Sequence, residues 1–200
     1  MLIIVNYGSG NIKAIANVYQ KLGVPFRIAQ APAELAGATR ILLPGVGIFD
    51  ETIKQLQRSG FTAELNAHVK DGTPVLGICV GMQIMAECSE EGTLPGLGWV
   101  KGRVRRFDTA GGQQLPHMGW NDVATTRNTP LFSQLDQGAK FYFLHSYYFD
   151  CAEQSSAVAT SDYGGRFSCA VQAGNVHGVQ FHPEKSHRFG VQLLKNFATF

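Results

Sequence analysis

Apolar residues follow two different patterns along this chain, and the pattern changes near residue 97. In the first half, short continuous apolar runs typical of buried strands alternate with longer stretches in which apolar residues recur every three or four positions. The predicted strands are 1–6, 24–29, 40–44 and 74–78, and the predicted helices are 11–23, 49–69 with an interruption at 59–61, and 80–92. This alternation predicts an α/β protein with a mostly parallel sheet and helices on both faces.

From residue 97 onward, short strand-like segments joined by turns replace the helical pattern. The predicted strands lie within 97–107, 114–124, 140–149, 156–163, 167–174 and 176–181, and a closing helix is predicted over 186–200. We expect these segments to add antiparallel strands to the same sheet or beside it. No repeat or linker divides the chain, so one domain over residues 1–200 is expected.

Composition excludes several classes of protein. Of the 200 residues, 44% are hydrophobic and 16% are charged, and the net charge of +2 is too balanced to suggest binding to nucleic acid or to a membrane surface. No basic leader precedes the first strand, which favours a cytoplasmic location. The four cysteines show no CxxC spacing, so neither a disulfide framework nor a metal site is indicated, and we expect no cofactor.

One cysteine stands in an unusual frame. Cys79 lies between the predicted strand 74–78 and the following helix, and glycines 77 and 81 flank it two residues away on each side. This is the small-x-nucleophile-x-small pattern of a nucleophile elbow, with Cys in place of Ser. Such a bend projects the sulfur beyond the carboxyl end of the sheet, where ligands bind in open α/β folds. The competing interpretation is a buried structural thiol, which we favour for Cys88, Cys151 and Cys169.

A candidate base lies near the end of the sequence. His182 closes an apolar strand, and Glu184 follows two residues later, on the same side of an extended chain. Glu184 can hold one ring nitrogen of His182 while the other faces a thiol, as in a nucleophile–base–orienter triad. A core histidine beside a surface glutamate is the simpler alternative, and a metal site of His182, Glu184 and His187 is a weaker one. The glycine-bearing loop 42–49 could present backbone amides to an oxyanion, or be an ordinary turn.

Together these segments resemble the class I glutamine amidotransferases, whose glutaminase domains carry a Cys-His-Glu triad. Further segments resemble, in order and nearly from end to end, the glutaminase subunits of imidazole glycerol phosphate synthase. The matching segments are YGSGN (7–11), LPGVG (43–47), GICVGMQ (77–83), PHMGWN (116–121), FYFLHSYY (141–148) and GVQFHPEKS (178–186). The triad segments mark only the class, whereas PHMGWN and YFLHSY point to this subfamily. Val80 stands where Leu is common, and a backbone amide is all that this position would supply.

The resemblance implies a role for each matching position. Cys79 would attack the side-chain amide of glutamine, His182 would relay protons and Glu184 would orient His182. The oxyanion would be held by the backbone amides of Val80 and, after a local rearrangement, of Val46 or Gly47. Glutamine would be contacted by Gln83 and by the backbone around Ser146 and Tyr147.

The resemblance also implies a partner. Ammonia would pass to a (β/α)₈ cyclase subunit that makes imidazole glycerol phosphate and aminoimidazole carboxamide ribotide in histidine biosynthesis. Asn11, Trp120, Tyr142 and Lys185 would lie near that partner, although Trp120 and Tyr142 also suit an ordinary core. Alternatives are a paralogue that feeds another synthase, such as one forming amidino sugars, and a non-enzymatic α/β module with an oxidation-prone cysteine. The His-Pro-Glu sequence argues against the second, because a redox sensor needs no His–Glu relay.

Overall fold

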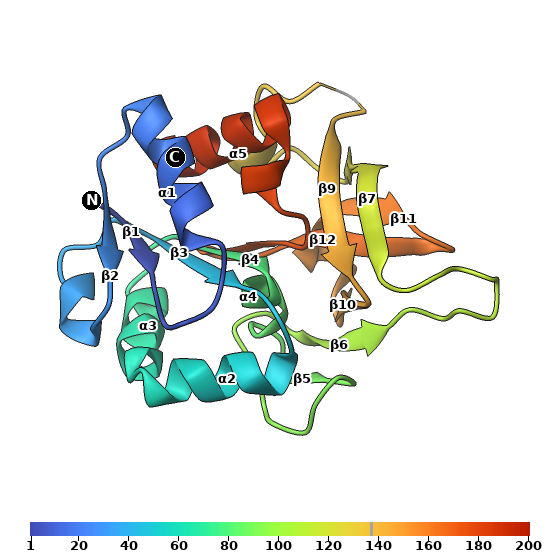
Figure 1. The fold of residues 1–200 in the computed structure, drawn as a ribbon, viewed down its shortest axis with the longest axis horizontal. Helices are drawn as coiled ribbons and strands as arrows, with labels where there is room; N and C mark the ends of the chain where they lie inside the picture. Colours follow the sequence, from blue (N-terminus) through green and yellow to red (C-terminus); the bar gives the residue numbers. More distant parts are fainter. Residues whose placement is uncertain (137) are drawn as a thin grey trace.

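The computed structural model describes residues 1–136 and 138–200 (Figure 1). Its centre is a parallel sheet in which the C-terminal strand β13 lies beside β4. The parallel strands follow the order β2-β1-β3-β4-β13. Their bounds are β1 Leu2–Val5, β2 Phe26–Ala29, β3 Arg40–Gly45, β4 Val75–Cys79 and β13 Val176–Val179. Every residue of β1, β4 and β13 is buried, which explains why these strands are continuous apolar runs.

Helices cover both faces of this sheet, as predicted (Figure 1). The helices α1 (Ile12–Leu22) and α5 (His187–Thr199) pack on one face, and α2 (Phe49–Arg58) and α3 (Phe61–Lys70) lie on the other. The predicted interruption at 59–61 is confirmed, because Gly60 adopts a φ of 76° that ends one helix and redirects the chain into the next. No helix in the described part of the chain has the length and apolar character that crossing a bilayer requires.

The helix predicted for residues 80–92 is wrong beyond its first turn. Helix α4 covers only Val80–Gln83. The carbonyl groups of the next residues accept hydrogen bonds from a returning loop instead of continuing the helix; these bonds are Leu97 N to Ile84 O (2.7 Å), Val100 N to Met85 O (3.1 Å) and Gly98 N to Ala86 O (3.0 Å). Cys88–Ser89 then form β5, a two-residue strand that pairs in parallel with β6. Tertiary hydrogen bonding has overridden local helical periodicity here.

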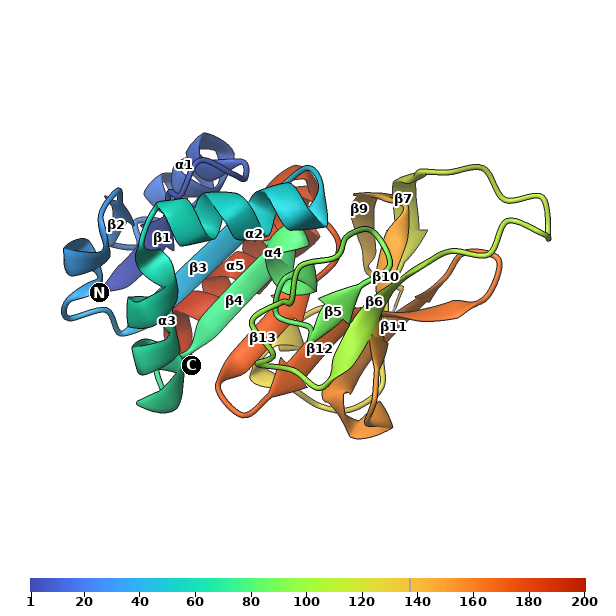
Figure 2. The ribbon, with the colours of Figure 1, turned by 90° about the horizontal axis from the view of Figure 1, so that it is seen from below.

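The second half adds strands both to the same sheet and beside it. Beyond β13 the sheet continues as β12-β10-β6-β5 (Figure 2). Strand β11 pairs with β12 and with β8. These strands are β6 Gly102–Arg106, β8 Ala124–Thr125, β10 Tyr147–Cys151, β11 Ala157–Asp162 and β12 Arg166–Ala173. A separate antiparallel pair consists of β7 (His117–Asp122) and β9 (Lys140–His145). Short 3₁₀ turns lie at Pro32–Leu35, Pro130–Phe132, Gln154–Ser156 and Pro183–Lys185.

Candidate active site

Cys79 sits at a strained bend where β4 ends and α4 begins. Its backbone has φ 55° and ψ −116°, a conformation that residues with a side chain rarely adopt. A Cβ atom on Gly81 would overlap the carbonyl oxygen of Leu43, and one on Gly77 would press against the backbone of Gly81. The bend therefore requires both glycines, as predicted for a nucleophile elbow.

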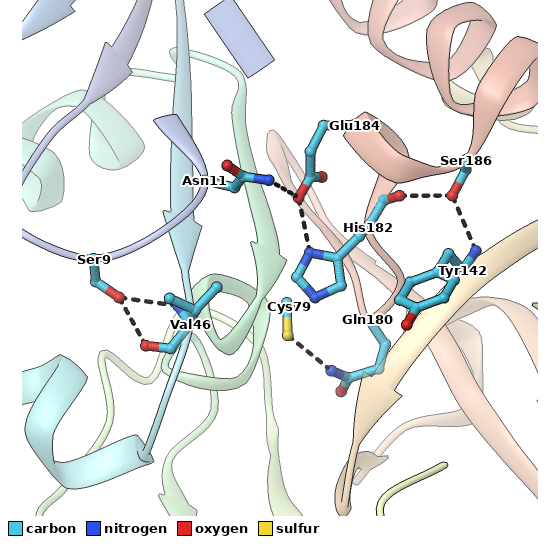
Figure 3. A network of polar contacts seen from close by, with 9 residues as sticks. All are labelled: Ser9, Asn11, Val46, Cys79, Tyr142, Gln180, His182, Glu184 and Ser186. Atoms are coloured by element: carbon cyan, nitrogen blue, oxygen red, sulfur yellow. Dashed lines mark hydrogen bonds and ion pairs between the residues drawn. The ribbon is translucent and has the colours of Figure 1, made fainter. Parts of the chain in front are cut away.

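His182 faces Cys79 from the segment after β13 (Figure 3). Its backbone amide donates to the carbonyl of Tyr142 (2.9 Å), and its own carbonyl accepts a bond from the Ser186 hydroxyl (2.6 Å). Nδ1 of its ring lies 2.9 Å from Oε1 of Glu184, and the two side chains are only 5% and 1% exposed. The structure thus brings Cys79 together with His182 and Glu184, which lie more than 100 positions later in the sequence, with the imidazole in the middle.

Glu184 is itself held by a residue of the N-terminal segment. Nδ2 of Asn11, just before α1, donates to Glu184 Oε1 at 3.3 Å. The same oxygen accepts from His182, so Asn11 fixes the carboxylate that orients the imidazole. The other oxygen, Oε2, is buried with no hydrogen-bond partner. Asn11 therefore contacts the candidate triad directly, a contact that sequence reasoning did not foresee.

The electrostatics of His182 reflect its two neighbours. Burial disfavours the charged imidazolium, but hydrogen bonds and charge from Cys79 and Glu184 outweigh it and raise the pKa of His182 to about 10. His182 therefore carries a proton on both ring nitrogens at neutral pH.

The loop after β3, predicted to supply an oxyanion amide, is tied to the N-terminal segment. The hydroxyl of Ser9 accepts a bond from the Val46 amide and donates to the Val46 carbonyl, both at 2.9 Å (Figure 3). The next residue, Gly47, has φ 104°. Because its N–H is already bound to Ser9, Val46 has no free amide for an oxyanion in this conformation, and its expected role stays a prediction.

Two of the predicted glutamine-binding residues, Gln83 and Tyr147, are linked to the sulfur of Cys79 through Gln180. Gln83, at the end of α4, donates from Nε2 to the carbonyl of Tyr147 (3.1 Å) and to Oε1 of Gln180 (3.0 Å). Gln180 in turn places its Nε2 3.8 Å from the sulfur of Cys79. The carbonyl of Ser146 accepts a bond from the amide of Phe107 (3.2 Å). Gln180 was not predicted from the sequence. Its position was a usable signal, because it is a polar residue inside an apolar strand and lies two residues before His182, on the same side of the chain.

Three of the four predicted partner-facing residues form one cluster at the outer face of β7 and β9. Trp120 stacks on His187 (5.0 Å between ring centroids) and meets Tyr142 edge-on (6.1 Å), while Nζ of Lys185 lies 5.5 Å from the centre of the Tyr142 ring. Trp120 is 46% exposed, so it is not a core aromatic. The alternative metal site of His182, Glu184 and His187 is not formed, because His187 stacks on Trp120. Within residues 1–136 and 138–200, no group of three His, Cys, Asp or Glu side chains is placed to hold a metal ion.

Comparison with known proteins agrees with this geometry. The family model described as glutamine amidotransferase class-I matches residues 3–199. The chain is 54% identical over 202 residues to the imidazole glycerol phosphate synthase subunit HisH of Bdellovibrio bacteriovorus, with 99% of each chain covered. It is 47% identical over 203 residues to the protein of the same name from Leptospira interrogans, with all of each chain covered.

Solved structures show the same fold at much lower sequence identity. A putative GMP synthase protein from Thermoplasma acidophilum superposes with a TM-score of 0.73 at 20% identity, covering 98% of this chain and 91% of the other. PurLQS from Thermotoga maritima superposes with a TM-score of 0.73 at 20% identity, covering 98% of this chain and 96% of the other. On the family match and the full-length identities together, this chain belongs to the class I glutamine amidotransferase family and, within it, to the HisH subunits of imidazole glycerol phosphate synthase.

Proposed function

We propose that this chain is the glutaminase subunit of an imidazole glycerol phosphate synthase and that Cys79, His182 and Glu184 are its catalytic triad. The observation that carries the proposal is the buried His182–Glu184 pair, 2.9 Å apart, facing a cysteine held at a strained strand-to-helix bend. Full-length identity to HisH subunits supports the choice of substrate and pathway.

The geometry suits acyl transfer from an amide. The sulfur of Cys79 attacks the side-chain amide carbon of glutamine, and the protonated ring of His182 gives its proton to the departing nitrogen, which leaves as ammonia. Water, deprotonated by His182, then attacks the γ-glutamyl thioester; glutamate leaves and Cys79 is regenerated. Glu184 keeps Nδ1 of His182 protonated, so that the other ring nitrogen faces the reacting atoms.

An oxyanion forms in both steps and needs donors. The Val80 amide follows the nucleophile directly in α4, and an amide of the loop at Val46 or Gly47 would complete the pair once the bonds to Ser9 open. Gln83 and the backbone of Ser146 and Tyr147 contact glutamine. Both N–H groups of Gln83 are occupied by Tyr147 and Gln180, so Gln83 offers a ligand its carbonyl oxygen.

A (β/α)₈ cyclase subunit would receive the ammonia in the cytoplasm. The surface that supports this partner is the face shared by β7 and β9, where Met118, Trp120, Tyr142 and Leu144 alternate with buried or half-buried neighbours. Met118 is 66% and Trp120 46% exposed, and large apolar side chains of this kind on one face mark an interaction surface. Lys185 lies against the Tyr142 ring of this surface, and Asn11 contacts the candidate triad through Glu184.

The test is glutamate release from glutamine, measured for the chain alone and for a mixture with the cyclase and its ribonucleotide substrate. We expect a large rise in the mixture and complete loss in Cys79→Ala, which should still bind the cyclase. Substantial activity in Cys79→Ala would refute the assigned nucleophile. Activation by a different synthase, with none by the cyclase, would keep the glutaminase chemistry and move the protein to another pathway.

A further inference from the structure

We propose that Gln180 is a further catalytic residue, which donates a hydrogen bond from its side-chain amide to the sulfur of Cys79. The inference rests on the proposed role of Cys79 as the nucleophile and adds a donor on the side of the sulfur away from Glu184 (Figure 3). Gln180 is fully buried, and its Nε2 lies 3.8 Å from Sγ. A buried amide beside a reacting atom needs a reason, because burying a polar side chain is costly unless it is hydrogen-bonded.

The orientation of the Gln180 amide follows from a single backbone group. The carbonyl of Tyr147 can only accept, so the atom of Gln83 that lies 3.1 Å from it must be the N–H₂ group. The second N–H of that group points at Gln180 (3.0 Å), and the atom it meets must therefore be the Gln180 oxygen. The Gln180 nitrogen is then left facing the sulfur, as a donor.

A pair of buried histidines fixes the same carbonyl from its other side. Nδ1 of His145 donates to the Tyr147 carbonyl at 2.7 Å, which leaves Nε2 of His145 to accept from His117 at 3.0 Å. Nε2 of His117 accepts in turn from Asn121 (3.2 Å), whose Nδ2 also donates to the carbonyl of Asp162 (2.8 Å). Each N–H group in this network has one acceptor, and the network runs from the surface strand β7 to Cys79.

The chemical consequence concerns the charge on the sulfur. An N–H directed at Sγ favours the thiolate over the thiol and holds the sulfur in one rotamer, opposite the donor that His182 provides. When the sulfur bonds to the amide carbon of glutamine, its negative charge passes to the amide oxygen, and the bond from Gln180 weakens. Gln180 therefore acts on the nucleophile before the attack and adds no proton-transfer step.

The experiment measures alkylation of Cys79 by iodoacetamide as a function of pH, followed by mass spectrometry of the peptide that carries it. Gln180→Met removes the donor and keeps an unbranched side chain of similar length. We expect the pH midpoint of Cys79 alkylation to rise by about one unit, with an unchanged rate at high pH, since a hydrogen bond to a charged group is worth at least that much. Glutamine hydrolysis at pH 7 should fall about tenfold and recover as the pH is raised.

Gln180→Glu is the second variant, because its carboxylate still accepts the Gln83 bond but presents an oxygen to the sulfur. We expect its midpoint to rise at least as far. The other groups facing Cys79 are His182, with Glu184 behind it, and Tyr7, and all three are unchanged in both variants. Gln172→Met, on β12, is the matched control and should leave Cys79 unaffected, and the exposed thiol of Cys88 is an internal reference in every sample.

The outcomes separate this inference from the proposed function. If glutamine fails to protect wild-type Cys79 from alkylation, the proposed function is wrong. If glutamine protects, but the midpoint is the same in wild type and in both Gln180 variants, the role of Gln180 is refuted. Failure of both variants to fold, seen as loss of a cooperative thermal transition, would assign Gln180 to core packing and would also overturn the proposal.

Discussion

His177, on β13, is a buried histidine whose replacement should make the protein both more stable and less sensitive to acid. It is 5% exposed, its Nδ1 has no hydrogen-bond partner, and the Phe200 ring lies 5.3 Å away. Burial lowers its pKa from 6.5 to about 4. The perturbation is His177→Leu, which fills a similar volume, carries no polar atom and lies outside the candidate active site.

The size of the acid effect follows from the two pKa values. Because the folded-state value is depressed, the unfolded chain binds a proton first, and stability is lost as pH falls below 6.5 until it reaches about 4. For this one group, proton uptake by the unfolded state costs about 0.2 kcal/mol of stability at pH 7.0 and about 1.4 kcal/mol at pH 5.5. Wild type should therefore lose about 1.2 kcal/mol more than His177→Leu between these pH values.

Urea denaturation at pH 7.0 and 5.5 measures the four free energies of unfolding. His117 and His145 are also buried with lowered pKa values, but they titrate alike in both proteins and cancel in the double difference. At pH 7.0 the variant should gain about 1 kcal/mol, because an unpaired buried polar atom is removed. Equal acid sensitivity in the two proteins would refute the reasoning, since it would mean that His177 is already protonated in the folded state or is never protonated in the unfolded one.

The remaining predictions concern the triad and the loop after β3. Glu184→Gln keeps an oxygen that can accept from His182 and Asn11 but removes the negative charge. Steady-state glutaminase assays with the cyclase present should therefore show kcat lowered about 10- to 100-fold. An unchanged kcat would contradict the orienting role of Glu184. Ser9→Ala removes both bonds that hold Val46, so glutamate release by the isolated chain should rise about tenfold, and a fall would show that Ser9 supports the active conformation instead.

The sequence was most informative where one residue type is demanded by local geometry. The glycines around Cys79 predicted the bend, because no side chain fits at either position, and His-Pro-Glu predicted the pairing, because residues two apart in an extended chain share a side. The alternation of strands and helices over residues 1–79 was confirmed on the same grounds, since buried parallel strands are continuous apolar runs.

What the sequence could not supply depends on contacts between distant segments. The helix predicted for 80–92 fails because amides of the loop 97–100 bind the carbonyls that a longer helix would have used. The bond from Ser9 to Val46 spans 37 positions of the sequence and the bond from Asn11 to Glu184 spans 173. No local sequence pattern predicts either bond. His117 and His145 fall within the predicted strands 114–124 and 140–149, but their pairing depends on the register between β7 and β9.

The position of β13 beside β4 has a consequence for how activity arises during synthesis. The strand beside Cys79 follows every other described strand in the sequence, and it leads into His182, 103 residues after Cys79. Pairings of such sequence separation form late, because loop closure must precede the contacts that stabilise it. A nascent or truncated chain that ends before β13 would carry the thiol without its proposed base, so we expect glutamine hydrolysis to begin only when this part of the fold has closed.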